Sequence, residues 1–287
     1  MLSYRHGYHA GNHADVLKHW VQVLCLEYLA QKDKPFLYID THAGAGLYAL
    51  FEGFAVKTGE AKTGVSRLWL HKNVPAVFKS YIKVVQVFNE KSLKYYPGSA
   101  MIAAHLLRED DRLRLVEMHS ADIAPLKQHL GRDRRVKIVD GDGFEQLKAS
   151  LPPATRRGLI LVDPPYEMKE DYWQVIKSVQ DGLMRFATGT YLIWYPLLSI
   201  AESARIEQKL KKLPCASWLN VQLAVSAKPQ GPGMYGSGMF VVNPPWVLKE
   251  QLQGGLPWLT KLLARDDAAH YTLDTSPAPH AGKQNIQ

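Results

Sequence analysis

Short runs rich in Val, Ile and Leu, separated by longer stretches with helical patterns, constrain the fold of this chain most. Five such runs occupy residues 36–39, 113–116, 136–139, 159–162 and 191–194. Buried strands that alternate with helices are typical of a parallel sheet covered on both faces. Two later runs, 219–225 and 239–242, flank a Gly- and Pro-rich connection at 228–238 and predict a hairpin-like pair at the sheet edge. We therefore expect an α/β fold with a mostly parallel seven-stranded sheet and an antiparallel last strand.

The length and the apolar content favour one large core with a modest insertion. The chain has 287 residues, of which 46% are hydrophobic and 22% charged. The connection at residues 50–96 is far longer than an ordinary strand-helix loop and contains a helical pattern from Val77 to Phe88. We expect a main domain formed by residues 1–49 and 97–265 and a helical insertion at 50–96.

Two more segments flank the strands. Residues 15–29 predict an amphipathic helix that Asn12 or Asp15 can cap. Residues 266–287 lack apolar periodicity and mix Pro, Gly, Ser and His, which predicts a flexible tail.

The charge balance favours a polyanionic partner. Lys and Arg exceed Asp and Glu by 35 − 27 = 8, and a positive excess attracts polyanions at long range. The insertion holds eight basic residues against three acids, which suits a nucleic-acid flank, although ordinary surface lysines would give the same count. The arginines just before the parallel strands should form a solvated rim away from a ligand crevice, which in such sheets lies at the strands' carboxyl ends.

The composition argues against a membrane span, a secreted disulfide scaffold and a zinc site. No run approaches the roughly 20 apolar residues of a membrane helix, and the first residues lack an apolar leader pattern. Cys25 and Cys215 stand alone in apolar surroundings, which indicates buried thiols in a reducing compartment. We expect a cytoplasmic protein.

The segment after the first strand has the small residues that a ligand-binding turn needs. Residues 40–46 read Asp-Thr-His-Ala-Gly-Ala-Gly, and glycines such as Gly44 let the backbone approach a ligand closely. A dinucleotide site would need an acid about 20 residues further on, but the insertion occupies that space. The next strand ends at Glu117, whose carboxylate can accept hydrogen bonds from ribose hydroxyls; a helix cap or a surface acid is the alternative. The pattern fits a nucleoside-type cofactor without a pyrophosphate.

The third strand ends with two acids among glycines, at residues 139–144. Asp142 can accept a hydrogen bond from an adenine amine while Phe144 packs beside the ring. A plain Asp-Gly turn is the competing interpretation.

The most informative motif is Asp163-Pro164-Pro165-Tyr166, directly after the fourth buried run. If Asp163 and the Pro164 carbonyl each accept one hydrogen of an exocyclic amine, the amine nitrogen can pyramidalise and direct its lone pair at an electrophilic methyl group. The carboxylate also stabilises the positive charge that develops on that nitrogen. Tyr166 offers a stacking face. Because a duplex pairs this amine, the target base must be unpaired or flipped out.

Asn243-Pro244-Pro245-Trp246 repeats nearly the same chemistry after another apolar run. The strand before it should be antiparallel, so its carboxyl end should point away from the crevice. We therefore assign the site to Asp163 and a structural role to Asn243.

Four histidines at positions 6, 9, 13 and 19 raise the question of a metal site. No cysteine accompanies them and their spacing is irregular, which argues against a metal. Rings beside Arg5 and Lys18 suit stacking on bases and contacts to phosphate.

The chain resembles the S-adenosylmethionine-dependent amino-methyltransferases, and in particular the RlmJ family of bacterial 23S ribosomal RNA adenine-N6 methyltransferases. The matching segments include residues 1–6, 10–19, 40–46, 95–99, 163–169 and 243–246. The resemblance implies a Rossmann-like class I methyltransferase fold and a product S-adenosylhomocysteine, without a metal. It also implies a monomer that acts on 23S RNA before subunit assembly. The loop at 228–238 does not match this pattern clearly.

The resemblance assigns roles to particular residues. It places Asp163 as the catalytic residue and Tyr4, with His6 and Lys18 nearby, at the RNA base. The S-adenosylmethionine pocket would be lined by His19, His42, Ser99, Glu117, Asp142, Gly143 and Asp163. A DNA adenine-N6 methyltransferase and a non-catalytic RNA-binding module are the alternative interpretations of the whole sequence.

Overall fold

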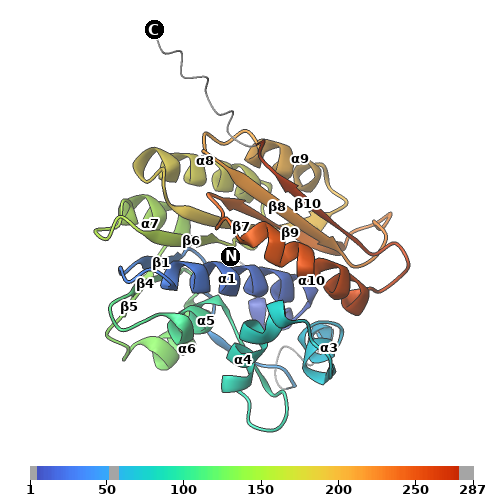
Figure 1. The fold of residues 1–287 in the computed structure, drawn as a ribbon. Helices are drawn as coiled ribbons and strands as arrows, with labels where there is room; N and C mark the ends of the chain where they lie inside the picture. Colours follow the sequence, from blue (N-terminus) through green and yellow to red (C-terminus); the bar gives the residue numbers. More distant parts are fainter. Residues whose placement is uncertain (1–4, 52–57, 278–287) are drawn as a thin grey trace.

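The computed structural model describes residues 5–51 and 58–277 and is built on one central sheet (Figure 1). The strand order is β10-β8-β9-β7-β6-β1-β4-β5. The strands are β1 (Leu37–Asp40), β4 (Arg112–Glu117), β5 (Val136–Asp140), β6 (Gly158–Val162), β7 (Thr190–Leu198), β8 (Trp218–Ala224), β9 (Met234–Val242) and β10 (His270–Thr275). Strands β5, β4, β1, β6 and β7 run parallel to one another. Strand β9 is antiparallel to both β7 and β8, as predicted.

The sheet has eight strands rather than seven, because β10 pairs antiparallel with β8. From the sequence alone, these residues are predicted to be part of a flexible tail. Strand β10 lies at the sheet edge with mostly exposed side chains, so it lacks the apolar run that reveals a buried strand. Lys211 Nζ also holds it through Asp274 Oδ2 at 2.7 Å. The β8-β9 pair is therefore inside the sheet, and β9 begins at Met234, within the predicted connection.

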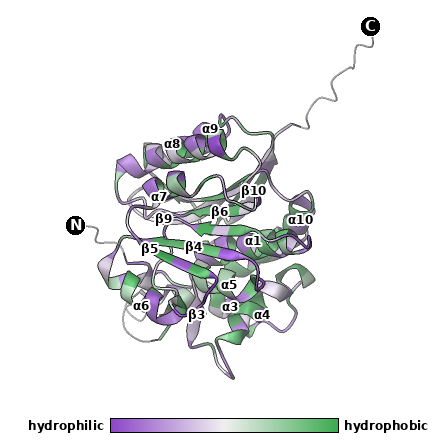
Figure 2. Ribbon diagram, turned by 90° about the vertical axis from the view of Figure 1, so that its left-hand side faces the viewer, coloured by the Kyte–Doolittle hydropathy of each residue, from purple (hydrophilic) through white to green (hydrophobic). Residues whose placement is uncertain are grey.

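Helices cover both faces of the sheet (Figures 1 and 2). One face packs against α7 (Gly143–Ser150), α8 (Lys169–Arg185) and α9 (Ala201–Leu210). The other packs against α1 (His13–Ala30), α5 (Ser99–Leu106), α6 (Ser120–Leu130) and α10 (Leu248–Leu263). Two hydrophobic cores result, and Figure 2 shows the apolar strands between the helical layers. Alternate residues of a strand face opposite sides. In β1, Tyr38 belongs to the first core cluster and Ile39 to the second.

The residues predicted as an insertion, 50–96, include short helices that lie beneath α1. Strands β2 (Leu47–Ala49) and β3 (Tyr95–Pro97) pair at the base of this segment. Between them lie η2 (Glu60–Thr63), α3 (Val65–Leu70), η3 (Ala76–Phe78) and α4 (Lys79–Val87). Helix α1 is buried along nearly its whole length, because the sheet lies on one side and the insertion and α10 lie on the other.

The start of α1 is fixed by Asn12, one of the two predicted caps. Its Oδ1 accepts hydrogen bonds from the amides of Ala14 and Asp15 at 2.9 and 3.0 Å. A cap of this kind satisfies amides that have no partner inside the helix. A short 3-10 turn, η1 (His6–Tyr8), precedes it.

The arginines at the amino ends of the parallel strands do more than form a solvated rim. Arg135 donates to the carbonyls of Ala104 and Leu107, at the end of α5. Arg157 donates to the Leu29 carbonyl near the end of α1. Positive side chains at helix carboxyl ends satisfy terminal carbonyls and complement the helix dipole. Over the described residues, no helix is long and apolar enough to cross a membrane.

Candidate active site

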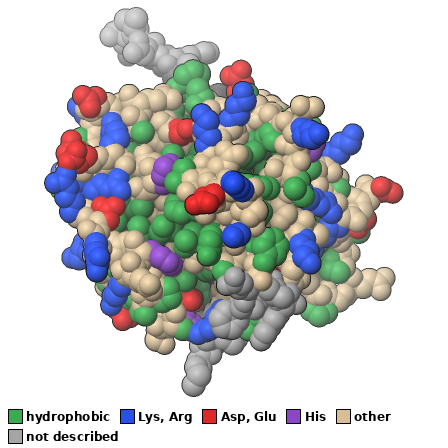
Figure 3. All heavy atoms as spheres, turned by 90° about the horizontal axis from the view of Figure 1, so that it is seen from below, with side chains coloured by type: hydrophobic (Ala, Val, Ile, Leu, Met, Phe, Trp, Pro, Cys, Tyr) green, Lys and Arg blue, Asp and Glu red, His purple; other side chains and the backbone are tan. Residues whose placement is uncertain are grey.

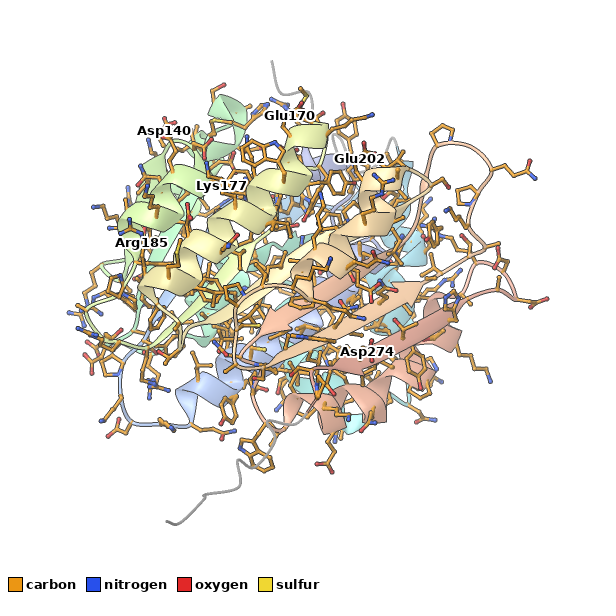
Figure 4. All side chains as sticks on the ribbon, turned by 90° about the horizontal axis from the view of Figure 1, so that it is seen from above. Asp140, Glu170, Lys177, Arg185, Glu202 and Asp274 are labelled. Atoms are coloured by element: carbon orange, nitrogen blue, oxygen red, sulfur yellow. The ribbon has the colours of Figure 1, made fainter. Side chains whose placement is uncertain are left out.

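The carboxyl ends of β1, β4, β5 and β6 meet around one cavity of about 280 Å³. In Figure 4, three labelled residues lie at this edge of the sheet: Asp140 at the end of β5, Glu170 near the start of α8 and Glu202 near the start of α9. Arg185, at the end of α8, lies on the opposite side. The cavity brings together residues that are far apart in the sequence. All eight proposed cofactor residues line it: His19, His42, Gly44, Ser99, Glu117, Asp142, Gly143 and Asp163.

Two glycines make the cavity wall possible. Gly44 has φ +62°, and a Cβ there would lie 2.2 Å from Tyr48 Oη. A Cβ on Gly143 would lie 2.0 Å from the Thr41 carbonyl oxygen, because the start of α7 packs directly on the turn after β1. A side chain at position 143 would therefore force the turn and the helix apart, and one at position 44 would have to displace the Tyr48 hydroxyl.

Glu117 is held in one orientation at the end of β4. Its Oε2 accepts the Gly44 amide at 2.8 Å, and its Oε1 accepts the His119 amide at 2.7 Å. Burial raises the pKa of this carboxyl group. His119, rather than Glu117, caps α6 through its side chain, so the helix-cap alternative does not apply to that helix. The fixed carboxylate is positioned to accept further hydrogen bonds from a ligand in the cavity.

Asp142 has a structural role as well as a place in the cavity wall. Its Oδ1 accepts the amides of Phe144 and Glu145 at 2.7 and 3.1 Å, which caps α7. Phe144 meets the ring of His42 edge-on, with centroids 5.2 Å apart. Burial lowers the pKa of His42 to about 4, so this imidazole is neutral near pH 7.

His19 and Ser99 form another part of the wall. His19 Nδ1 lies 2.7 Å from Tyr96 Oη, which is 2.9 Å from Tyr81 Oη in the insertion. Burial holds the pKa of His19 well below its usual value. The Ser99 carbonyl accepts Gln22 Nε2 at 2.9 Å, which ties α5 to α1. The insertion thus supports the cavity through α1.

Asp163 follows β6 directly, and its side chain is 14% exposed. Its Oδ2 lies 2.6 Å from Lys18 Nζ. The same ammonium lies 2.9 Å from Asp15 Oδ1, and Lys18 is only 4% exposed. Lys18, predicted to lie near the RNA base, is therefore buried and paired with Asp163.

A second cavity of about 180 Å³ adjoins the first at Asp163. Both cavities are lined by His6, Lys18, Asp163 and Pro165, and the second also by Asp15, Tyr166 and Trp194. Tyr166 donates its hydroxyl to the Trp194 carbonyl at 2.7 Å, and the two rings are 5.8 Å apart. The second cavity thus has an aromatic wall and a charged floor.

The amino-terminal segment closes this region. His6 Nε2 lies 2.9 Å from Asp15 Oδ2, and its ring contacts Tyr48 edge-on at 5.1 Å. Tyr4, the third predicted RNA residue, lies outside the described residues. From the sequence alone, Asp15 is predicted only as a possible helix cap. Its three-residue spacing from Lys18 on one helix was the signal that the two side chains could pair.

Asn243 lies at the opposite edge of the sheet, as predicted. Strand β9 is antiparallel to β7, so its carboxyl end lies beside the amino end of β7. Asn243 Nδ2 donates to the carbonyls of Ala187 and Gly189, both at 2.8 Å. These bonds fix the turn before β7 and give Asn243 a structural role.

The described residues contain no group of three or more His, Cys, Asp or Glu side chains that could hold a metal ion. Both cysteines are free: Cys25 is buried, and Cys215 is half-buried.

The fold and the convergent site define a Rossmann-like class I methyltransferase. A sequence model of the family described as "Ribosomal RNA large subunit methyltransferase D, RlmJ" matches residues 33–275, and the chain belongs to that family. Among curated relatives, the Ribosomal RNA large subunit methyltransferase J of Escherichia coli (strain K12) is 49% identical over 95% of this chain and 98% of the relative. The protein of the same name from Haemophilus influenzae is 46% identical over 96% of this chain and 98% of that relative.

A solved structure shares this fold. The crystal structure of a protein from Legionella pneumophila str. Philadelphia 1 is 34% identical and has a TM-score of 0.86 over 93% of this chain and 98% of that chain. Family membership makes the chain an enzyme of the methyltransferase class and implies use of S-adenosylmethionine. A non-catalytic RNA-binding module is therefore the wrong class.

Proposed function

We propose that this protein transfers a methyl group from S-adenosylmethionine to N6 of an adenine in 23S ribosomal RNA. The observation that carries the proposal is the position of Asp163 where two cavities meet, one suited to a nucleoside cofactor and the other to a planar base. The enzyme would act on an unpaired or flipped-out base, as a monomer, in the cytoplasm and before subunit assembly.

The chemistry of the first cavity fits S-adenosylmethionine. Glu117 is a fixed, buried acceptor suited to two ribose hydroxyls. Asp142 is suited to the adenine amine, and Phe144 and His42 offer apolar ring surface beside it. Gly44 and Gly143 keep the wall free of side chains. When bound, the cofactor supplies an electrophilic methyl group.

The second cavity supplies the surroundings that a target adenine needs. Tyr166 and Trp194 form an aromatic wall, and stacking of a base on an aromatic ring contributes about 1–3 kcal/mol. Lys18 and His6 bring polar groups to the floor. A base can enter only after it leaves the helical stack, because its amine must reach Asp163.

Asp163 orients and activates the amine. Lys18 holds Oδ2 at 2.6 Å, and we assign Oδ1, together with the Pro164 carbonyl, as acceptors for the two amine hydrogens. The nitrogen lone pair then points at the methyl group, and the carboxylate stabilises the charge that grows on nitrogen. Methyl transfer would form the new N–C bond as the methyl–sulfur bond of the cofactor breaks, which leaves S-adenosylhomocysteine. The cationic amine nitrogen would then release one proton to the Asp163 carboxylate or to water.

The surface of the insertion fits an RNA partner. Exposed lysines on the described part of the insertion are Lys62, Lys72, Lys79, Lys83, Lys91 and Lys94. Figure 3 views this side of the molecule and shows many Lys and Arg side chains on it. Such a surface attracts phosphates without sequence preference, so it supports RNA binding and leaves the choice of nucleotide to the cavity.

The test is incubation with isotopically labelled S-adenosylmethionine and one of three substrates: protein-free 23S RNA, assembled large subunits, or DNA. We expect label in the free RNA, and digestion to nucleosides should yield N6-methyladenosine by mass spectrometry. Label on another base, or on another atom of adenine, would overturn the N6 assignment. Label in DNA alone would replace RNA with DNA as the substrate.

A further inference from the structure

We propose that Asp15 is a positioning residue for methyl transfer, because it holds Lys18 and His6 in the places from which they orient Asp163 and the target base. The proposal rests on the function proposed above. It adds a residue that touches neither the cofactor cavity nor Asp163 itself and that acts through its neighbours.

Asp15 contacts several of the polar groups that lie beneath the second cavity and connects them. The residue is 1% exposed. Its Oδ2 accepts the Gly11 amide at 2.8 Å and lies 2.9 Å from His6 Nε2. Its Oδ1 lies 2.9 Å from Lys18 Nζ. One carboxylate thus fixes the turn before α1, the imidazole that lines both cavities and the ammonium that binds Asp163.

The carboxylate remains ionised although it is buried. Burial alone would raise the pKa of Asp15, but the charges of His6 and Lys18 and the hydrogen bond from His6 outweigh burial and hold the pKa well below its usual range. Its position in the first turn of α1 adds the favourable end of the helix dipole. Unpaired buried charges are costly. Removal of one charged group of this network therefore destabilises the groups that remain.

Lys18 responds to two carboxylates at once. Its Nζ lies 2.9 Å from Asp15 and 2.6 Å from Asp163. Burial alone would lower the pKa of Lys18, but the two carboxylates raise it above its usual range. Without the charge of Asp15, the ammonium would be drawn to Asp163 alone. Asp163 would then be more fully neutralised and moved, and it would stabilise less of the charge that develops on the amine.

His6 responds to the same change. Its Nε2 would lose a charged acceptor, and its ring would lose one of the contacts that hold it at the mouth of both cavities. Asp15 lines the second cavity but not the first. Its removal should therefore affect base placement and transfer while S-adenosylhomocysteine binding remains.

The test compares Asp15→Asn with a matched control, Asp111→Asn. Asp111 is as deeply buried, at 0% exposure. It lies at the amino edge of the sheet, which is the edge formed by the amino ends of the parallel strands. There it accepts a hydrogen bond from the Phe36 amide at 3.0 Å and binds Arg108. Each variant needs its kcat and KM for RNA, its S-adenosylhomocysteine affinity by calorimetry, and its thermal unfolding midpoint. Both should unfold at lower temperature than the wild type.

Only Asp15→Asn should lose turnover, by about 10²-fold, because small displacements of reacting groups cost that much. Its affinity for S-adenosylhomocysteine should stay within twofold of the wild type. A kcat equal to that of the wild type would overturn the proposal. Equal losses of kcat and S-adenosylhomocysteine affinity would also overturn it, since they indicate a general loss of folded protein.

A double-variant cycle covers the case in which Asp15→Asn folds poorly. Asp15→Asn combined with Lys18→Met removes both charges of the pair, which is less destabilising than leaving one alone. If Asp15 acts through Lys18, the double variant should turn over no more slowly than Lys18→Met alone. Multiplied losses in kcat that persist when His6 is also replaced by Ala would show a role independent of both neighbours and overturn the inference.

Discussion

The two Pro-Pro motifs of this chain lie at opposite edges of one sheet, and they show how strand direction separates a site from a turn. Asp163-Pro164-Pro165-Tyr166 follows the parallel strand β6 and reaches both cavities. Asn243-Pro244-Pro245-Trp246 follows the antiparallel strand β9 and binds the backbone before β7. Tyr166 is 6% exposed and Trp246 is 78% exposed. Nearly the same four residues therefore acquire different roles from their surroundings.

The charged groups of the two edges differ in the same way. At the amino edge, Arg135 and Arg157 are occupied by helix carbonyls. At the carboxyl edge, Glu117, Asp163 and Lys18 are fixed by neighbours and also line a cavity. Charges at the first edge hold helix ends in place, whereas those at the second line a cavity.

The largest effect should come from Asp163→Asn, which gives the first motif the asparagine of the second. The amide keeps the shape of the carboxylate but cannot stabilise positive charge on the amine, so kcat should fall by about 10²–10³-fold. Single-turnover transfer to 23S RNA measures this loss. The thermal midpoint and S-adenosylhomocysteine affinity should show that the variant is folded. Turnover at the wild-type rate would remove the proposed role of the carboxylate.

Asn243→Ala tests the opposite edge and should change stability rather than catalysis. The variant leaves the carbonyls of Ala187 and Gly189 without this donor, at a cost of about 1–3 kcal/mol. Asn243 also has φ +51°, a conformation that Asn tolerates better than Ala does. Denaturant unfolding measures the loss, and kcat per folded molecule should match the wild type. A large fall in kcat with unchanged stability would contradict the structural assignment.

The sequence predicts the parts of this comparison that depend on local pattern and strand direction. Buried runs revealed the strands β1 and β4 to β9, and the antiparallel direction of β9 separated Asp163 from Asn243. Strand β10 was missed because its side chains are mostly exposed. The pairing of Lys18 with Asp163 joins residues 145 positions apart, and no local pattern encodes it. Lysines are rarely buried, so a surface role was the natural expectation for Lys18.

Acidification should destabilise the carboxyl edge first. The pKa of His42 falls to about 4 on burial, so between about pH 4 and its ordinary value near 6.5 the unfolded chain binds a proton that the native state excludes. Stability therefore rises with pH across this window, and His19 adds to the rise. Asp40 opposes it, because burial raises its pKa to about 6 and stability falls as that group ionises. Glu117 opposes it too, because burial raises the pKa of its carboxyl group, so a comparison with His42→Gln is needed to isolate the contribution of the His42 imidazole.

The amino edge should respond at lower pH. Burial alone would raise the pKa of Asp111, but hydrogen bonds from Arg108 and the Phe36 amide lower it, so its contribution is lost below its ordinary value near 3.8. Urea titrations between pH 4 and 6.5 test the difference. His42→Gln should flatten the slope, with about 2 kcal/mol less change over the window, and Asp111→Asn should leave it unchanged. An unchanged slope in His42→Gln would contradict the assigned burial of a neutral imidazole.

The smallest effects should come from the aromatic residues that end the two motifs. Tyr166→Phe removes the hydroxyl that donates to the Trp194 carbonyl at 2.7 Å, which should cost about 1 kcal/mol and raise the KM for RNA, because the aromatic wall is less firmly held. Trp246→Phe changes an exposed ring, and its free energy of unfolding should stay within about 0.5 kcal/mol of the wild type. Urea unfolding and steady-state kinetics on both variants measure the contrast. If Tyr166→Phe and Trp246→Phe change the KM for RNA equally, the position of Tyr166 beside the second cavity has no effect on RNA binding. The target base would then be placed by other residues.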